Sequence, residues 1–156
     1  MNLLSLAKKA FGALLCAGVF AGAAHAAEQG TPAEAEALVK KAIAYIKTNG
    51  PDKAYEEFNT GKSFKDRDLY IVVYDLTGKN LAHGANLKLV GKDLIGLKDP
   101  DGVPVIRRFV DTAKEKGKGW VDGYKFMTPL TQKMESKALY LERVGDTLVG
   151  CGIYKS

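Results

Sequence analysis

Cysteine, histidine and tryptophan are scarce in this chain, and each shortage narrows the possible chemistry. The 156 residues include two cysteines, two histidines and one tryptophan. Cys16 lies in an apolar stretch near the start, which leaves Cys151 alone in the rest, so no intramolecular disulfide is expected. We interpret Cys151 as a small buried core residue. His83 is the only histidine after residue 26, and a single histidine cannot assemble a protein metal site.

Familiar catalytic motifs are also missing. The sequence has no Gly-x-Ser-x-Gly elbow, no His-Glu-x-x-His motif and no glycine loop for phosphates, which argues against the enzymes that use them. Asp99-Pro100-Asp101-Gly102 begins like a calcium loop but lacks the later ligands and the final glutamate of such a loop. The sequence therefore predicts a protein that is not an enzyme and uses neither a metal nor a cofactor.

The first 26 residues have the pattern of a secretory leader. Lys8 and Lys9 are followed by the apolar stretch Ala10–Ala23 and by Ala24-His25-Ala26, the small-residue pattern that signal peptidase reads. The apolar stretch is shorter than the roughly 20 residues that span a bilayer. We expect cleavage after Ala26, export to a bacterial periplasm, and one domain over residues 27–156.

The charge of the chain excludes an obvious nucleic-acid partner. Loss of the leader lowers the formal charge from +5 by two. The remaining lysines and arginines are scattered along the chain, whereas nucleic-acid-binding domains concentrate theirs on one face or in a recognisable motif. No nucleic acid is therefore expected among the partners.

Residues 31–60 predict two helices. Thr31-Pro32-Ala33-Glu34 is a capping box with proline at the first helical position. Apolar residues then recur at helical spacing up to Ile46, and Asn49-Gly50-Pro51 ends the helix. A shorter helix is expected over Asp52–Phe58. The apolar stripe of the first helix favours packing along a sheet within the chain. The alternative hypothesis is a homodimer that forms through this first helix.

Residues 66–154 predict a sheet with one long crossover. A helix is expected over Val105–Lys116, with its apolar residues on one face. The nearly continuous apolar run in the first strand indicates a central strand that is covered on both faces. The five predicted strands cover Leu69–Asp75, Lys79–His83, Gly119–Phe126, Lys137–Val144 and Thr147–Tyr154. This order predicts an α+β fold, a PAS-like five-stranded antiparallel sheet with a long N-terminal helix and a helical crossover between strands two and three.

An ordered set of short motifs resembles bacterial single Cache domains. The motifs are Asp68–Gly78, Leu81–Gly84, Leu89–Leu94, Lys98–Gly102, Gly119–Asp122, Ser136-Lys137 with Tyr140, and Val149–Tyr154. The resemblance implies an extracytoplasmic PAS-like sensor of small molecules, often short carboxylic acids. Family members usually sit in chemoreceptors or sensor kinases between two membrane helices. With no second membrane helix or transmitter after the sheet, we expect a stand-alone secreted form. Lys125–Leu130 and Ser136 differ from the family's usual pattern.

A pocket for a short carboxylate needs a cation or aligned donors for the charge, and an apolar wall for the tail. His83 ends the second strand, and Lys137 begins the fourth. Alternation places Tyr74 on one face of the first strand and Trp120, Tyr124 and Phe126 on one face of the third. The residues that we expect to bind the ligand are Tyr74, His83, Trp120, Tyr124, Phe126, Lys137 and Tyr140.

Each of these residues also has a purely structural interpretation. The aromatic residues could be ordinary sheet core, Lys137 one more solvated lysine, and His83 a structural histidine. Arg107 and Arg108 begin the crossover helix, and either could point toward the pocket or into solvent.

Two functions follow from the sequence. The first is a periplasmic protein that binds or senses a small organic acid of the acetate, propionate, pyruvate or lactate class, without its own transmitter. The alternative is a ligand-free interaction module that docks on a membrane sensor kinase, a chemoreceptor or a transporter.

Overall fold

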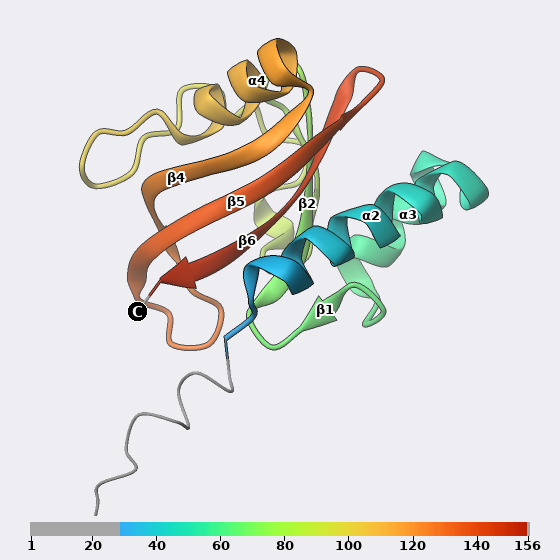
Figure 1. The fold of residues 1–156 in the computed structure, drawn as a ribbon, viewed down its shortest axis with the longest axis horizontal. Coiled ribbons are helices and arrows are strands. Elements are labelled where there is room, and N and C mark those ends of the chain that lie inside the picture. Colours follow the sequence, from blue (N-terminus) through green and yellow to red (C-terminus); the bar gives the residue numbers. More distant parts are fainter. Residues whose placement is uncertain (1–28, 156) are drawn as a thin grey trace, which may run out of the picture.

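The computed structural model describes residues 29–155 as one antiparallel sheet with helices on both faces (Figure 1). The predicted leader of residues 1–26 lies outside these residues. The strands are β1 (Lys65–Asp66), β2 (Leu69–Asp75), β3 (Asn80–His83), β4 (Lys118–Met127), β5 (Met134–Val144) and β6 (Thr147–Lys155). The helices are α2 (Pro32–Asn49), α3 (Pro51–Thr60), the single turn η1 (Leu87–Leu89) and α4 (Val105–Lys116). None of the helices within this range has the length and apolar character of a bilayer span.

The five predicted strands form the sheet in the order β3-β2-β6-β5-β4, and every neighbouring pair is antiparallel. The crossover helix α4 connects β3 to β4, so the predicted α+β, PAS-like fold is confirmed. The two-residue strand β1 is an addition that pairs with the start of β2, Lys65 opposite Tyr70. Two residues are too short for an alternating pattern, so the sequence carries no signal for β1.

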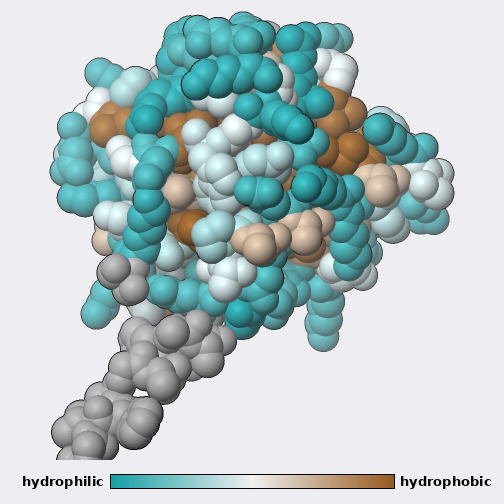
Figure 2. Space-filling model, viewed as in Figure 1, coloured by the Kyte–Doolittle hydropathy of each residue, from teal (hydrophilic) through white to brown (hydrophobic). Residues whose placement is uncertain are grey.

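Strand β2 divides the interior into two cores. Leu69, Ile71 and Val73 pack in the core under α2 and α3, whereas Tyr70 and Val72 pack in the core under α4. Figure 1 shows α2 and α3 on one side of the sheet and α4 on the other. The prediction of a central strand covered on both faces is confirmed. The outer surface in the same view is mostly hydrophilic, with apolar residues in small separate groups (Figure 2).

Helix α2 begins and packs as its sequence predicts. The capping box is present, with the Glu34 N–H donating to the Thr31 hydroxyl and the Thr31 N–H to the Glu34 carboxylate. The apolar stripe of α2, Ala35, Val39 and Ala42 among it, lies in the core beneath the helix. This placement accounts for the stripe within one chain, and a homodimer through α2 stays a prediction.

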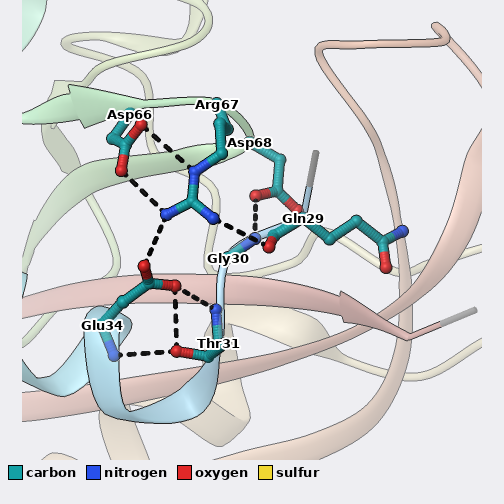
Figure 3. Close-up of polar contacts among 7 residues, drawn as sticks. All are labelled: Gln29, Gly30, Thr31, Glu34, Asp66, Arg67 and Asp68. Carbon is teal, nitrogen blue, oxygen red and sulfur yellow. Dashed lines mark hydrogen bonds and ion pairs between the residues drawn. The ribbon is translucent and has the colours of Figure 1, made fainter. Parts of the chain in front are cut away.

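Arg67 fastens the start of α2 to the turn between β1 and β2 (Figure 3). Its guanidinium lies 2.7 Å from the Glu34 carboxylate and 2.8 Å from that of Asp66, and it donates to the Gln29 carbonyl at 3.1 Å. Hydrogen bonds from the Thr31 N–H and from Arg67 lower the pKa of Glu34 to about 2. The segment that leads into α2 is therefore tied to the edge of the sheet by polar contacts.

A β-bulge in β4 changes which side chains face each core. Val121 pairs with Leu139, but Tyr124 pairs with Lys137, so β4 contains one extra residue between these pairs. Gly123 occupies the bulge with φ +72°, a left-handed conformation that glycine adopts without a Cβ clash. The prediction that Trp120 shares a face with Tyr124 is therefore wrong, because the extra residue shifts the alternation by one.

Gly123→Ala tests how much the bulge depends on glycine. A Cβ at position 123 would meet no atom within 4 Å, so the cost comes from the left-handed backbone alone. We expect a loss of about 1 kcal/mol of unfolding free energy in urea denaturation. Gly96→Ala is the control, because its Cβ also has open space and its φ is not left-handed. Equal stability of the two variants would contradict this account of the bulge.

Candidate functional site

A lysine ammonium is buried on the α4 face of the sheet. Lys137 of β5 is 3% exposed, and its Nζ donates to the hydroxyls of Tyr70 at 2.6 Å and Tyr154 at 3.1 Å. Within residues 29–155 no carboxylate forms an ion pair with it. An ammonium has three N–H donors, so one of them has no protein acceptor in the described chain. Burying a cation without a counter-ion is costly.

The sheet register and one glycine admit this side chain. Lys137 pairs with Tyr124 on β4 and with Tyr154 on β6. Gly152 lies two residues before Tyr154 on β6, and a Cβ there would overlap Cε of Lys137. The aliphatic stem of the lysine therefore occupies space that only glycine leaves open.

Aromatic rings surround the ammonium. Nζ lies 4.4 Å from the ring centroids of Tyr70 and Tyr154 and 5.2 Å from that of Phe126. Ring faces attract a cation by about 0.5–2 kcal/mol each. Burial raises the pKa of both tyrosines, so their hydroxyls stay neutral. The rings and hydroxyls reduce the free-energy cost of burying the charge but do not remove it.

The direction of the tyrosine protons follows from the hydrogen bonds. Tyr154 donates its hydroxyl proton to the Met127 carbonyl at 2.7 Å. The two hydroxyl oxygens lie 3.4 Å apart, and because the Tyr154 proton is already used, Tyr70 is the donor in that contact. This long bond leaves the Tyr70 proton available to a better acceptor in the site.

His83 supplies a neutral donor beside the ammonium. The ring is 2% exposed, and its Nδ1 accepts from the backbone N–H groups of Asn86 at 3.0 Å and Ala85 at 3.3 Å. Nδ1 therefore carries no proton, and the neutral ring carries its proton on Nε2. Burial, reinforced by the nearby Lys137 charge, lowers the pKa of His83 to about 3.

The cavity beside Lys137 and His83 is small, and the side chain of Phe126 borders both this cavity and the hollows outside it. A cavity of about 10 Å³ is lined by Tyr74, Tyr124 and Lys137 among others, which is room for about one water molecule. A hollow of about 270 Å³ outside it shares the walls Tyr70, His83 and Phe126, and another of about 420 Å³ also borders Phe126. A small organic acid needs more room than the inner cavity offers, and Phe126 is the side chain that borders all three spaces.

The structure brings five of the seven predicted site residues around this cavity. They are Tyr74, His83, Tyr124, Phe126 and Lys137. That these residues bind a ligand stays a prediction, since the cavity alone does not test it.

Trp120 and Tyr140 lie on the opposite face of the sheet. The Trp120 indole donates to Glu36 of α2 at 2.9 Å, and Tyr140 packs in the core under α2, its hydroxyl donating to Glu142. The bulge displaces Trp120. Tyr140 is an odd number of residues from Lys137, so strand alternation alone separates the two.

Two arginines considered for the pocket lie elsewhere, and two tyrosines that contact the ammonium were not among the predicted site residues. Arg107 points to solvent and Arg108 donates to the Gly123 carbonyl, so neither lines the cavity. Tyr70 and Tyr154, which hold the ammonium, were missed. Tyr70 alternates with Tyr74 on β2, and that signal was sufficient to find it.

Comparison with known proteins places the chain in a sensor family. A family model described as Single Cache domain 2 matches residues 17–156. The chemotaxis protein McpP of Pseudomonas putida is 32% identical over 91 residues, which is 57% of this chain and 16% of McpP. The sensor histidine kinase MctS of Rhizobium johnstonii is 32% identical over 90 residues, 56% of this chain and 19% of MctS. The aligned region thus spans less than a fifth of either relative.

Solved sensor domains share the fold. A methyl-accepting chemotaxis protein from Vibrio parahaemolyticus has a TM-score of 0.66 at 28% identity, covering 78% of this chain and 86% of that one. A periplasmic sensor domain of a chemotaxis protein has a TM-score of 0.64 at 26% identity, covering 80% and 90%. A Cache chemosensory domain described by its carboxylic acid recognition has a TM-score of 0.64, covering 80% and 88%. At 23% identity, this last likeness concerns the fold alone.

The neutral state of His83 predicts a specific pH dependence of stability. An unfolded histidine has a pKa near 6.5, whereas the folded value is about 3, so the folded state binds fewer protons between these values. The contribution of neutral His83 to the unfolding free energy is therefore fully present above the unfolded pKa and is lost as the pH falls toward the folded pKa. We expect His83 to contribute a loss of roughly 2 kcal/mol between about pH 6.5 and about pH 5.

Urea unfolding of the wild type and of His83→Gln at a series of pH values measures this loss. The glutamine keeps an acceptor for the backbone N–H groups and does not titrate. The difference between the two stability curves should change over this pH range, since the carboxylates contribute equally to both. Parallel curves would show that His83 protonates as easily in the folded state as in the unfolded one.

Proposed function

Because the chain belongs to the single Cache domain 2 family, we propose that it is a periplasmic domain that binds a short carboxylic acid at Lys137. Cache domains of chemoreceptors and sensor kinases support an extracytoplasmic ligand-sensing role for the chain. The choice of a carboxylate comes from the charge and the donors of the site.

The unused N–H of Lys137 is the observation that carries the proposal. A carboxylate at this position would pair the buried cation and satisfy its remaining donor, which offsets the cost of burying the charge. Nε2–H of His83 and the hydroxyl of Tyr70 are neutral donors beside it. Tyr124, which carries a further neutral hydroxyl, lines the same cavity.

One cation with neutral donors matches a ligand with one negative charge. A phosphate dianion would leave excess negative charge in the interior, and a cationic ligand would face the ammonium. Val72, Phe109 and Leu139 close the cavity with apolar surface, which suits a short aliphatic tail. Acetate, propionate, pyruvate and lactate fit this description.

The size of such ligands limits their affinity. The best very small ligands gain about 1.5 kcal/mol per heavy atom. Acetate is therefore limited to about −6 kcal/mol, which corresponds to a Kd on the order of tens of micromolar. Larger members of the class can bind more tightly, provided that Phe126 moves to admit them.

Binding without catalysis agrees with the chemistry of the nearby groups. The pKa of about 3 leaves His83 too weak a base to accept a proton near neutral pH. Cys151 packs in the opposite core, where burial raises the pKa of its thiol to about 12, so it forms little thiolate.

Lys137→Met tests the role of the charge. Methionine keeps the apolar stem and removes the ammonium, so we expect carboxylate affinity to fall at least about 30-fold in calorimetry. The ligand-free variant should unfold at an equal or higher Tm, because an unpaired buried charge has been removed. Lys47→Met on the exposed side of α2 is the matched control. Unchanged affinity in Lys137→Met would remove this residue from the site.

Gly152→Ala tests the position of the ammonium without removing it. The added Cβ would overlap Cε of Lys137, and the flexible lysine must then shift away from Tyr70 and Tyr154. We expect affinity for propionate to fall about tenfold or more, since the charge no longer meets the other donors. Gly96→Ala, whose Cβ meets nothing within 4 Å, should bind like the wild type. Wild-type affinity in Gly152→Ala would mean that the lysine position is not critical.

A further inference from the structure

A second buried charged group lies near the site. Asp68 directly precedes β2, two residues before Tyr70, and is 1% exposed. Tyr70 accepts a hydrogen bond from the Lys137 ammonium at 2.6 Å, so the chain brings the Asp68 carboxyl near that charge, which acts to lower its pKa. No hydrogen bond joins Asp68 to Lys137 within the described chain, so the two charges interact across the interior rather than as a contact pair.

The Asp68 carboxyl is only half satisfied. Oδ1 accepts from the backbone N–H of Gly30 at 2.6 Å (Figure 3), whereas Oδ2 is buried and has no partner among residues 29–155. A carboxylate oxygen that is buried without a donor is costly. Burial raises the pKa of Asp68, opposed by the Gly30 N–H and by the charges of Lys137 and Arg67.

The charge balance of the interior then depends on Asp68. His83 is neutral, and Arg67 is occupied by the more exposed carboxylates Glu34 and Asp66. Apart from Asp99, whose carboxylate accepts three backbone N–H groups, the buried groups that remain charged are the Lys137 ammonium and, when ionised, the Asp68 carboxylate. An incoming ligand anion would place a second negative charge beside the same cation.

On the basis of the proposed function, we propose that a carboxylate binds at Lys137 together with one proton, which Asp68 takes up from solvent on Oδ2. The ligand anion takes over the role of counter-ion to the ammonium. The Asp68 carboxyl, now neutral, keeps its bond from the Gly30 N–H on Oδ1. The domain thus responds to the product of ligand and proton concentrations.

Other groups that face Asp68 do not supply this proton linkage. Tyr154 and Cys151 approach it from β6, and burial raises the pKa of both groups, that of Cys151 to about 12. Arg67 in the adjoining turn is held in its charged form by Asp66 and Glu34. The Lys137 charge also acts on His83, but burial is the larger cause that holds the pKa of His83 at about 3. Between weakly acidic and weakly basic pH, Asp68 is therefore the group whose protonation the ligand is expected to change.

The sign of the effect follows from the same charges. Ligand binding offsets the Lys137 charge that lowers the pKa of Asp68, so the pKa of Asp68 is higher in the bound state than in the free state. Affinity therefore rises as the pH falls between these two values. The slope is at most about tenfold per pH unit, the limit for uptake of one proton.

Calorimetric titration with propionate and with pyruvate, from about pH 5.5 to about pH 8, tests the proposal. Repeating each titration in two buffers of different protonation enthalpy counts the protons taken up. We expect uptake approaching one proton per ligand in the wild type and none in Asp68→Asn, whose affinity should not vary with pH. The pyruvate carboxyl stays ionised over this range, which separates the ligand's own titration from that of the protein.

Asp66→Asn is the matched control, because Asp66 ends β1 just before the same turn but is exposed, and this variant should keep the wild-type pH dependence. Zero proton uptake in the wild type would overturn the inference, whatever the stability of the variants. An unchanged pH slope in folded Asp68→Asn would also overturn it. Failure of the wild type to bind either acid at every pH would instead contradict the proposed function.

Discussion

The buried ammonium of Lys137, which forms no ion pair within residues 29–155, is the constraint on which the site depends. A charge in this position is tolerated because two tyrosine hydroxyls accept from it and three rings lie against it. These contacts leave one N–H unused, and neutral donors stand around the same small cavity. A charged side chain held this way is costly, since the same volume filled by an apolar residue would be more stable. Under the proposed function, an anion bound at Lys137 would offset this cost.

The two cores of the sheet differ in composition. The core beneath α2 and α3 is built from apolar residues and contains Cys151 and Tyr140. The core beneath α4 contains the polar groups and the cavity. Strand β2 contributes alternate residues to both cores. Phe126 borders the cavity and both hollows, so under the proposed function it is the side chain that must move to admit a ligand larger than the cavity.

Much of the fold could be predicted because its signals are local. The capping box at Thr31, the stripe of α4 and the apolar run of β2 each specify an element within a few residues. The site was harder, since it depends on register across strands. Position and chemistry predicted Lys137, His83 and Tyr74, which line one cavity in the structure, and their role in binding stays a prediction. Trp120 was predicted on the wrong face because Gly123 permits a bulge that the sequence pattern alone does not indicate. Tyr154 and Gly152 were missed because only the pairing of β5 with β6 brings them close to Lys137.

The bulge at Gly123 also constrains how this protein can change over evolutionary time. Every residue of β4 after the bulge keeps its orientation only because one extra residue precedes it. Loss of that residue would turn Tyr124 and Phe126 away from the ammonium and toward the other core. A codon deletion there would thus rewrite the pocket while leaving every amino acid that lines it in the sequence. In this segment, chain length carries as much information as residue identity.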